Sequence, residues 1–199
     1  MAEVCTCMTY CNDYEQSALL RIHKVSMQDA TLRFADGTTP SYQVATFVNL
    51  GPVSPGVEMR IAASGGSTVL RERQIGHLQI RGPCVMMGYH NNPKANAECF
   101  PGDDWFDSGD LGFIHDGQLV LTGRAKEMII AYGANYYCYE IEDVVSSGVP
   151  GTVAARVATT SVRDLVQGTE LLAVFFVPAS ADGLEQLHAH GVLLPELAQ

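Results

Sequence analysis

Short stretches in which hydrophobic and polar residues alternate fill much of the first two thirds of the chain. Residues 57–61 and 76–82 both alternate in this way, and a turn containing glycine follows each of them. A period of two, bounded by glycine and proline, is typical of half-buried β-strands. The stretch 32–44, which contains the Asp36-Gly37 turn, predicts a hairpin. Strands of this length and spacing indicate a small β-barrel or a sandwich.

A short helix and a second hairpin are predicted in the middle of the chain. Pro93 suits the first turn of a helix, and the residues up to Phe100 can continue it. Further along, hydrophobic residues at 113–114 and 119–121 flank the sequence His-Asp-Gly-Gln. Because Asp-Gly between two hydrophobic runs is a strong signal for a tight turn, we expect these runs to pair as antiparallel strands.

The last third of the chain combines strands with helices. Three strands are predicted, at residues 128–130, 152–159 and 171–177. The third is almost continuous Leu, Val and Phe, so we expect it to be a central strand. The alternation of strands and helices in this part, after the strands of the first part, predicts an α+β chain.

Two helices are predicted in this last third. The first covers residues 139–147, places Ile141, Val144 and Val145 on one face and ends at Gly148. The second begins in the stretch 181–190.

The amino-acid composition of the chain limits the kinds of molecule that it can bind. The chain has 199 residues, 47% of them hydrophobic and 17% charged, which is ordinary for a globular protein with a core. Its 22 acidic residues outnumber its 12 basic ones, and the formal net charge is -10. Nucleic-acid binding requires clustered Lys and Arg, so this balance argues against it. A single nucleotide needs only one or two local cations and stays compatible with the composition.

The chain contains no apolar run near the roughly 20 residues that span a membrane, and its first residues lack the layout of a signal peptide. Six cysteines in such a chain are typical of reduced cytoplasmic thiols. The spacing of Cys5, Cys7 and Cys11 allows a zinc site, but no second ligand pair accompanies it, and buried small side chains are the simpler interpretation.

The strongest chemical signal lies in the stretch 105–142. Asp110 stands between Gly109 and Leu111-Gly112, and flanking glycines let the backbone turn sharply and hold a carboxylate at the end of a strand. A fixed carboxylate can accept two hydroxyl hydrogen bonds, as the diol of a ribose offers. The alternative is an ordinary aspartate in a turn.

Arg124 follows Asp110 by one predicted hairpin. If that hairpin returns along the first strand, both side chains can converge on one ligand, the acid on the sugar and the arginine on phosphate or ribose. The alternative for this pair is a surface salt bridge worth ~0–1 kcal/mol. Lys126 and Glu127, which follow at once, are compatible with simple solvated charge.

Four segments of the chain carry a resemblance to a known family. They are GHLQIRGP at 76–83, WFDSGDLG at 105–112, GRAKE at 123–127, and GANYY with the following EIE at 133–142. In order and spacing they resemble the motifs of the adenylate-forming, AMP-binding superfamily, which includes acyl-CoA synthetases, fatty acyl-AMP ligases and the adenylation domains of peptide synthetases. The form of the last segment looks most similar to adenylation domains of polyketide and nonribosomal peptide assembly lines, or to acyl-AMP ligases.

The resemblance implies roles for individual residues. Asp110 would bind the ribose hydroxyls and Arg124 the nucleotide. Lys126 would be the hinge on which a small C-terminal domain turns between adenylate formation and thioester formation. Gly133, Ala134 and Asn135 would line the tunnel for a phosphopantetheine thiol, carried by CoA or by an acyl carrier protein.

The same resemblance implies the domain organisation. Residues 1–123 would be the C-terminal portion of the large domain, with a small β-barrel subdomain. Residues 124–126 would be the hinge, and residues 127–199 an incomplete small α+β domain. Ser108 stands where the family has Thr, and Cys138 where it has Pro.

Met1-Ala2-Glu3 resembles the end of a further family motif, Y-G-M-T/S-E, in which Glu3 would bind magnesium. Two other family features are missing from the sequence. The Ser/Thr/Gly-rich phosphate loop does not occur, and Lys126 is the last lysine, so the catalytic lysine of the family's C-terminus has no counterpart.

We therefore expect a fragment of a cytoplasmic ligase that uses ATP and magnesium to convert a carboxylic acid into an acyl-AMP and then passes the acyl group to a pantetheine thiol. The rest of the same enzyme would be its partner, and the fragment alone would be inactive. The alternative is a non-catalytic split or degenerate adenylation module that docks a carrier protein or a partner subunit.

Overall fold

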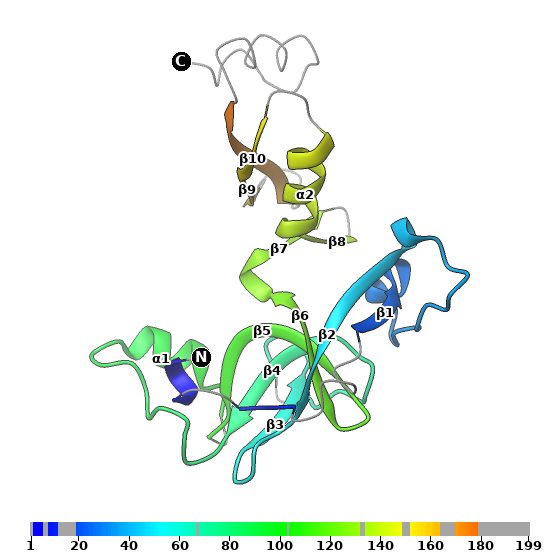
Figure 1. Cartoon of the computed structure of the whole chain (residues 1–199). Helices are drawn as coiled ribbons and strands as arrows, with labels where there is room; N and C mark the ends of the chain where they lie inside the picture. Colours follow the sequence, from blue (N-terminus) through cyan, green and yellow to red (C-terminus); the bar gives the residue numbers. More distant parts are fainter. Residues whose placement is uncertain are drawn as a thin grey trace. The chain divides into compact units, whose positions relative to one another are not determined.

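The structure is a computed structural model, and it describes residues 2–5, 8–11, 19–66, 68–102, 104–131, 134–148, 152–163 and 170–178 (Figure 1). The chain divides into two compact units, Met1–Ala125 and Lys126–Gln199. No described helix is both long enough and apolar enough to cross a membrane.

The first unit is built on one antiparallel sheet in the strand order β1-β2-β6-β5-β4-β3. Its strands are β1 (Leu19–His23), β2 (Val44–Pro52), β3 (Glu58–Ala62), β4 (Gly76–Arg81), β5 (Phe106–His115) and β6 (Gln118–Arg124). Its helices are α1 (Pro93–Cys99) and the short 3-10 turns η1 (Ala2–Val4), η2 (Lys24–Gln28) and η3 (Ser41–Gln43). The strands predicted at 57–61 and 76–82 are therefore confirmed as β3 and β4.

Hydrophobic residues pack against both faces of this sheet. Leu119 belongs to one buried cluster, together with Ile61, Leu78 and Phe106, whereas the next residue, Val120, belongs to another. Successive strand residues point to opposite faces, so β6 contributes to a core on each side. The second cluster comprises Ile22, Leu32, Ala45, Phe47, Phe113 and Val120.

The hairpin predicted around Asp116-Gly117 is confirmed as β5 and β6. Both turn residues have positive φ, 49° at Asp116 and 72° at Gly117, which is the conformation that an Asp-Gly turn favours. Glu72 stabilises the turn from elsewhere in the chain, because its carboxylate accepts hydrogen bonds from the backbone N–H groups of both residues, each at 3.1 Å. The predicted helix is also confirmed as α1, where the Asn92 side chain accepts from the Ala95 N–H at 3.1 Å.

The hairpin predicted within 32–44 is wrong. Phe34 forms an isolated bridge with Ile22 of β1 instead of pairing within the stretch. The Leu32 N–H donates to the carbonyl of Arg73 at 2.8 Å, 41 residues away along the chain. Partners distant in sequence therefore take the backbone groups that a local hairpin would have used.

The predicted class, α+β, agrees with a mixed chain of helices and mostly antiparallel strands. The strand order places β1 and β3 at opposite ends of the sheet, and no pairing among the described residues joins them. The closed barrel stays a prediction.

The second unit contains two small antiparallel sheets and a helix. Its elements are η4 (Ala125–Glu127, at the boundary), β7 (Met128–Ala131), β8 (Ala134–Tyr137), α2 (Cys138–Gly148), β9 (Thr152–Arg163) and β10 (Glu170–Pro178). β7 pairs with β8, and β9 with β10. Within the described part of the chain β10 has β9 as its one neighbour in the sheet, and its predicted central position stays a prediction. The helix predicted at 181–190 lies outside the described residues.

Of the three residues predicted for one face of α2, Ile141 and Val145 are half-buried and Val144 is exposed. The Thr159 hydroxyl of β9 donates to the Cys138 carbonyl at 3.1 Å, and the Thr159 N–H donates to the Glu142 carboxylate at 2.8 Å. Positions 138, 141, 142 and 145 lie on the same side of a helix, so these bonds are compatible with packing of Ile141 and Val145. Val144, which the periodicity placed on the buried face, is 67% exposed.

Candidate functional site

Asp110 lies inside β5, where the register with β4 is interrupted, and not at the end of a strand as predicted. His77 of β4 pairs with Leu111, whereas Gln79 pairs with Asp107. Residues 108–110 thus stand opposite a single residue of β4 and form a bulge. Gly109, with a φ of 73°, supplies the conformation that the bulge requires.

Two side chains within the bulge replace backbone hydrogen bonds that the interrupted register cannot make. Asp107 Oδ1 accepts from the Gly109 N–H at 2.9 Å. The Ser108 hydroxyl oxygen accepts from the Asp110 N–H at 3.1 Å. These short-range bonds hold the backbone from which the Asp110 side chain extends.

Arg124 is the partner of Asp110 on the neighbouring strand. The two residues are paired in the register of β5 and β6, and Arg124 Nε lies 3.1 Å from Asp110 Oδ1. The Asp110 side chain is 11% exposed and the Arg124 side chain 61% exposed. The hairpin therefore brings together the two residues that the sequence singled out, with the carboxylate shielded and the guanidinium open to a ligand.

The other predicted site residues have separate positions. Lys126 is exposed in η4, at the boundary between the two units. Ala134 and Asn135 begin β8, where they pair with Ala131 and Ile130 of β7. Gly133 lies outside the described residues.

Glu3 lies in η1 and is held from the loop after β4. Its carbonyl accepts from the Met86 N–H at 2.8 Å, and its Oε1 accepts from the Tyr89 hydroxyl at 3.2 Å. Burial raises the pKa of Tyr89, and the Glu3 carboxylate raises it further, so this hydroxyl stays a donor. None of the hydrogen bonds or ion pairs among described residues joins Glu3 to Asp110. One carboxylate of this kind fits magnesium, which commonly takes one or two protein carboxylates along with substrate phosphates.

The described residues do not test the zinc site considered for Cys5, Cys7 and Cys11. The Cys5 thiol donates to the Cys84 carbonyl at 3.3 Å, and Cys7 lies outside the described residues. Among the residues that are described, the side chains that lie close enough together to hold a metal ion are those of Glu72, His115 and Asp116. Because both Glu72 oxygens already accept from the hairpin turn, this group is explained as a turn cap.

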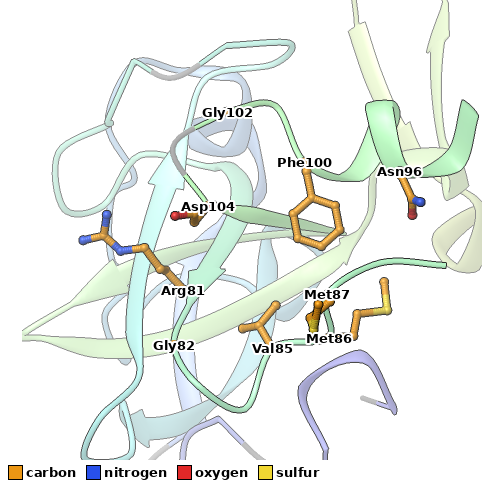
Figure 2. A pocket seen from close by; sticks show the side chains of 9 residues that line it. All are labelled: Arg81, Gly82, Val85, Met86, Met87, Asn96, Phe100, Gly102 and Asp104. Carbon is orange, nitrogen blue, oxygen red and sulfur yellow. The ribbon is translucent and has the colours of Figure 1, made fainter. Parts of the chain in front are cut away.

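A cavity of about 760 Å³ lies in the first unit, apart from the acid–arginine pair (Figure 2). Its lining residues are Arg81, Gly82, Val85, Met86, Met87, Asn96, Phe100, Gly102 and Asp104. Two of the polar side chains in its wall have structural partners. Asn96 bonds both the N–H and the carbonyl of Tyr89, and Arg81 binds Glu58 at 2.6 Å. We assign no ligand to this cavity.

One ion pair next to Asp110 was not predicted. His77 Nδ1 lies 3.3 Å from Asp107 Oδ2, across β4 and β5. The hydrogen bond to Asp107 raises the pKa of His77. Burial raises the pKa of Asp107, but hydrogen bonds from His77 and Gly109 outweigh this and leave it lowered. Alternation had identified residues 76–82 as a strand, yet the register that brings the two side chains together has no signal in either segment.

Comparisons with known proteins show which family the chain resembles. No family model matches the chain. The nonribosomal peptide synthetase atqA of Aspergillus terreus (strain NIH 2624 / FGSC A1156) is 38% identical over 145 residues, which cover 70% of this chain and 15% of that protein. The atromentin synthetase invA5 of Paxillus involutus is 36% identical over 142 residues, 71% of this chain and 14% of that protein.

Solved structures agree with these relatives. A multidomain structure with the adenylation and ketoreductase domains of a keto acid-selecting nonribosomal peptide synthetase module has a TM-score of 0.76 and 36% identity, and covers 96% of this chain and 16% of its own. Fatty acyl-adenylate ligases from E. coli and L. pneumophila give a TM-score of 0.74 at 25% identity, over 95% of this chain and 33% of theirs. The chain belongs to the adenylate-forming superfamily. It spans about 15% of the length of the curated relatives it matches.

Proposed function

We propose that this chain is part of an adenylation domain that activates a carboxylic acid with ATP as an acyl-AMP and transfers the acyl group to the thiol of a phosphopantetheine arm. The observation that carries the proposal is the Asp110–Arg124 pair, with 3.1 Å between Oδ1 and Nε, in a chain that is similar to adenylation domains. The acceptor would be CoA or a carrier protein.

The pair is suited to the ribose and phosphate side of a nucleotide. Asp110 is shielded from water and its backbone is fixed by the bulge, so its carboxylate needs little reorganisation to accept hydroxyl hydrogen bonds. Arg124 presents several N–H donors, of which Nε already faces Asp110. Its exposed guanidinium can therefore bind the nucleotide while it keeps Asp110 in place.

The hinge and the tunnel belong to the same proposal. Lys126 is the first residue of the second compact unit and lies in an exposed single turn, which supports a role as the hinge. Residues 1–123 would then act as part of the large domain, with its sheet as part of a barrel, and residues 127–199 as part of the small one. Gly133, Ala134 and Asn135 would guide the pantetheine arm.

Glu3 would contribute a magnesium ligand when the nucleotide is bound, and the ion would offset phosphate charge. The family's phosphate loop and its C-terminal catalytic lysine have no counterpart in the sequence. Such preorganised charge typically contributes several kcal/mol to a transition state. We therefore propose that these 199 residues bind nucleotide but do not catalyse ATP–pyrophosphate exchange on their own.

Binding of AMP to the chain tests this function. In amide NMR spectra, AMP should shift the signals of residues 107–112 and Arg124, while 2′,3′-dideoxy-AMP, which lacks the diol, should bind at least about tenfold more weakly. Equal binding of both nucleotides, or AMP shifts confined to other residues, would contradict the proposed site. Carboxylate-dependent exchange by the purified chain would contradict its incompleteness. A chain that binds no nucleotide but binds a carrier protein would support the docking module instead.

A further inference from the structure

Three groups connect β4 to the bulge that carries Asp110. The His77 imidazole lies 3.3 Å from one Asp107 oxygen and 3.5 Å from the other. Asp107 Oδ1 in turn accepts from the Gly109 N–H at 2.9 Å, one residue before Asp110. One carboxylate thus joins a side chain of the neighbouring strand to the backbone of the bulge.

We propose that His77 is a positioning residue for the nucleotide-binding carboxylate: through Asp107 it fixes the bulge at Gly109 and thereby the direction of Asp110. This inference rests on the proposed function of Asp110. His77 itself does not touch the nucleotide. Its effect passes through the Asp107 carboxylate, which would otherwise be free to rotate away from the Gly109 N–H.

The surroundings of the pair favour such a role. The side chains of His77 and Asp107 are 20% and 19% exposed, so water screens them less than it screens a surface pair. Gln79, the register partner of Asp107, is 1% exposed, and its Oε1 accepts from Arg60 Nε at 2.8 Å. The Asp107 side chain therefore stands beside a fixed amide, and His77 is the ionisable group that holds its carboxylate from β4.

The charge on His77 links the positioning to pH. Opposite His77 lie Ala62 on β3 and Leu111 on β5, neither of which ionises. The charged groups on these strands and their neighbours are Asp107, Arg60 behind Gln79, the Asp110–Arg124 pair beyond the bulge, and the Glu58–Arg81 pair at the other end of β3 and β4. Asp107 raises the pKa of His77, so the ionic form of the pair persists below that raised value and is lost as the pH rises through it.

The nucleotide readout compares wild type with His77→Gln, His77→Lys and the control His90→Gln, which changes an exposed histidine. In wild type the affinity for AMP should fall between pH 6 and pH 8.5, because His77 loses its charge over that range. We expect His77→Gln to weaken AMP binding about tenfold at pH 6, as loss of an orienting partner typically does. The affinity of this variant should not fall between pH 6 and pH 8.5. His77→Lys should bind AMP within about twofold of the wild-type affinity at pH 6. This affinity should stay constant up to pH 8.5, because lysine keeps its charge over that range. The control should match wild type.

A second readout needs no nucleotide. The Gly109 amide signal should titrate with the His77 pKa in wild type and His90→Gln, and should lose that titration in His77→Gln, whose complete set of amide signals would show that it folds. A Gly109 signal indifferent to His77, or AMP binding equal in wild type and His77→Gln at all pH values, would overturn the inference while leaving the proposed function intact. In a further outcome, wild type does not bind AMP although the Gly109 signal still titrates with His77. The proposed nucleotide function would then be wrong and His77 would have a structural role only, which also overturns the inference.

Discussion

Arg124 Nε lies 3.1 Å from Asp110 Oδ1, and the two residues face each other in the register of β5 and β6. The tight turn at Asp116-Gly117 sets the register from His115–Gln118 to Gly112–Leu121, and a one-residue shift between Gly112 and Leu111 then places Asp110 opposite Arg124. The carboxylate is nearly buried while the guanidinium is mostly in solvent. Because of this difference in exposure, the pair should contribute little to the stability of the fold and more to the binding of a ligand.

Removing either member of the pair should affect binding more than stability. Asp110→Asn and Arg124→Gln should each lower the free energy of unfolding by about 1 kcal/mol or less, because a largely exposed partner contributes little. Both should weaken AMP binding about tenfold or more, since charge-assisted hydrogen bonds are lost. Urea unfolding followed by the fluorescence of Trp105, the one tryptophan, measures the first quantity, and calorimetry the second. A large loss of stability with unchanged binding would assign the pair to the fold.

Gly112 lets β5 approach β6 closely. A Cβ at this position would lie 2.5 Å from the carbonyl oxygen of Val120, a backbone atom that has little freedom to move. Gly112→Ala should therefore destabilise the first unit by about 2 kcal/mol or more. Gly37→Ala is the matched control, because nothing lies within 4 Å of the added carbon there. Equal urea midpoints for the two variants would show that the strands can separate without cost.

Phe113 anchors the cluster on one face of the sheet. Its side chain is 0% exposed and packs with Ile22, Leu32 and Val120. Phe113→Ala should lower the free energy of unfolding by about 3–5 kcal/mol, through lost burial and the cavity left behind. Val48→Ala, on β2 with 51% exposure, should cost much less. Chemical denaturation checks both, and similar losses would contradict the assigned core.

Asp36 should make the stability of the protein depend on pH in the acid range. Hydrogen bonds from the Thr38 side chain and backbone, together with those from Thr39, lower the pKa of Asp36 from 3.8 to about 2. A lowered folded-state pKa contributes stability that is present above the unfolded value and is lost as the pH falls toward the folded one. The difference in urea midpoint between wild type and Asp36→Ala should thus shrink between pH 5 and pH 2. A carboxyl carbon of Asp36 that titrates near 3.8 by NMR would refute this.

The parts of the fold predicted correctly are those with local causes. Pro93 and the Asn92 cap start α1, and Asp116-Gly117 joins two hydrophobic runs into the β5–β6 hairpin. The same hairpin predicted that Asp110 and Arg124 lie near each other, but a register shift between Leu111 and Gly112 decides that Arg124 is the direct partner of Asp110. The motif order added the family, which the geometry of one acid and one arginine would not have identified.

The parts predicted wrongly or missed depend on contacts between distant segments. The stretch 32–44 has the composition of a hairpin, but its backbone pairs with Arg73 and with Ile22 of β1 instead of with itself. His77 and Asp107 are 30 residues apart, and only the interrupted register of β4 with β5 places them together. Turn and cap chemistry is encoded in neighbouring residues, so the amino-acid order alone specified the hairpin and the helix start. Strand register between remote segments depends on which side chains pack and which backbone groups find partners, and for that reason the bulge at Gly109 and the pair behind Asp110 emerged only once the whole first unit had folded.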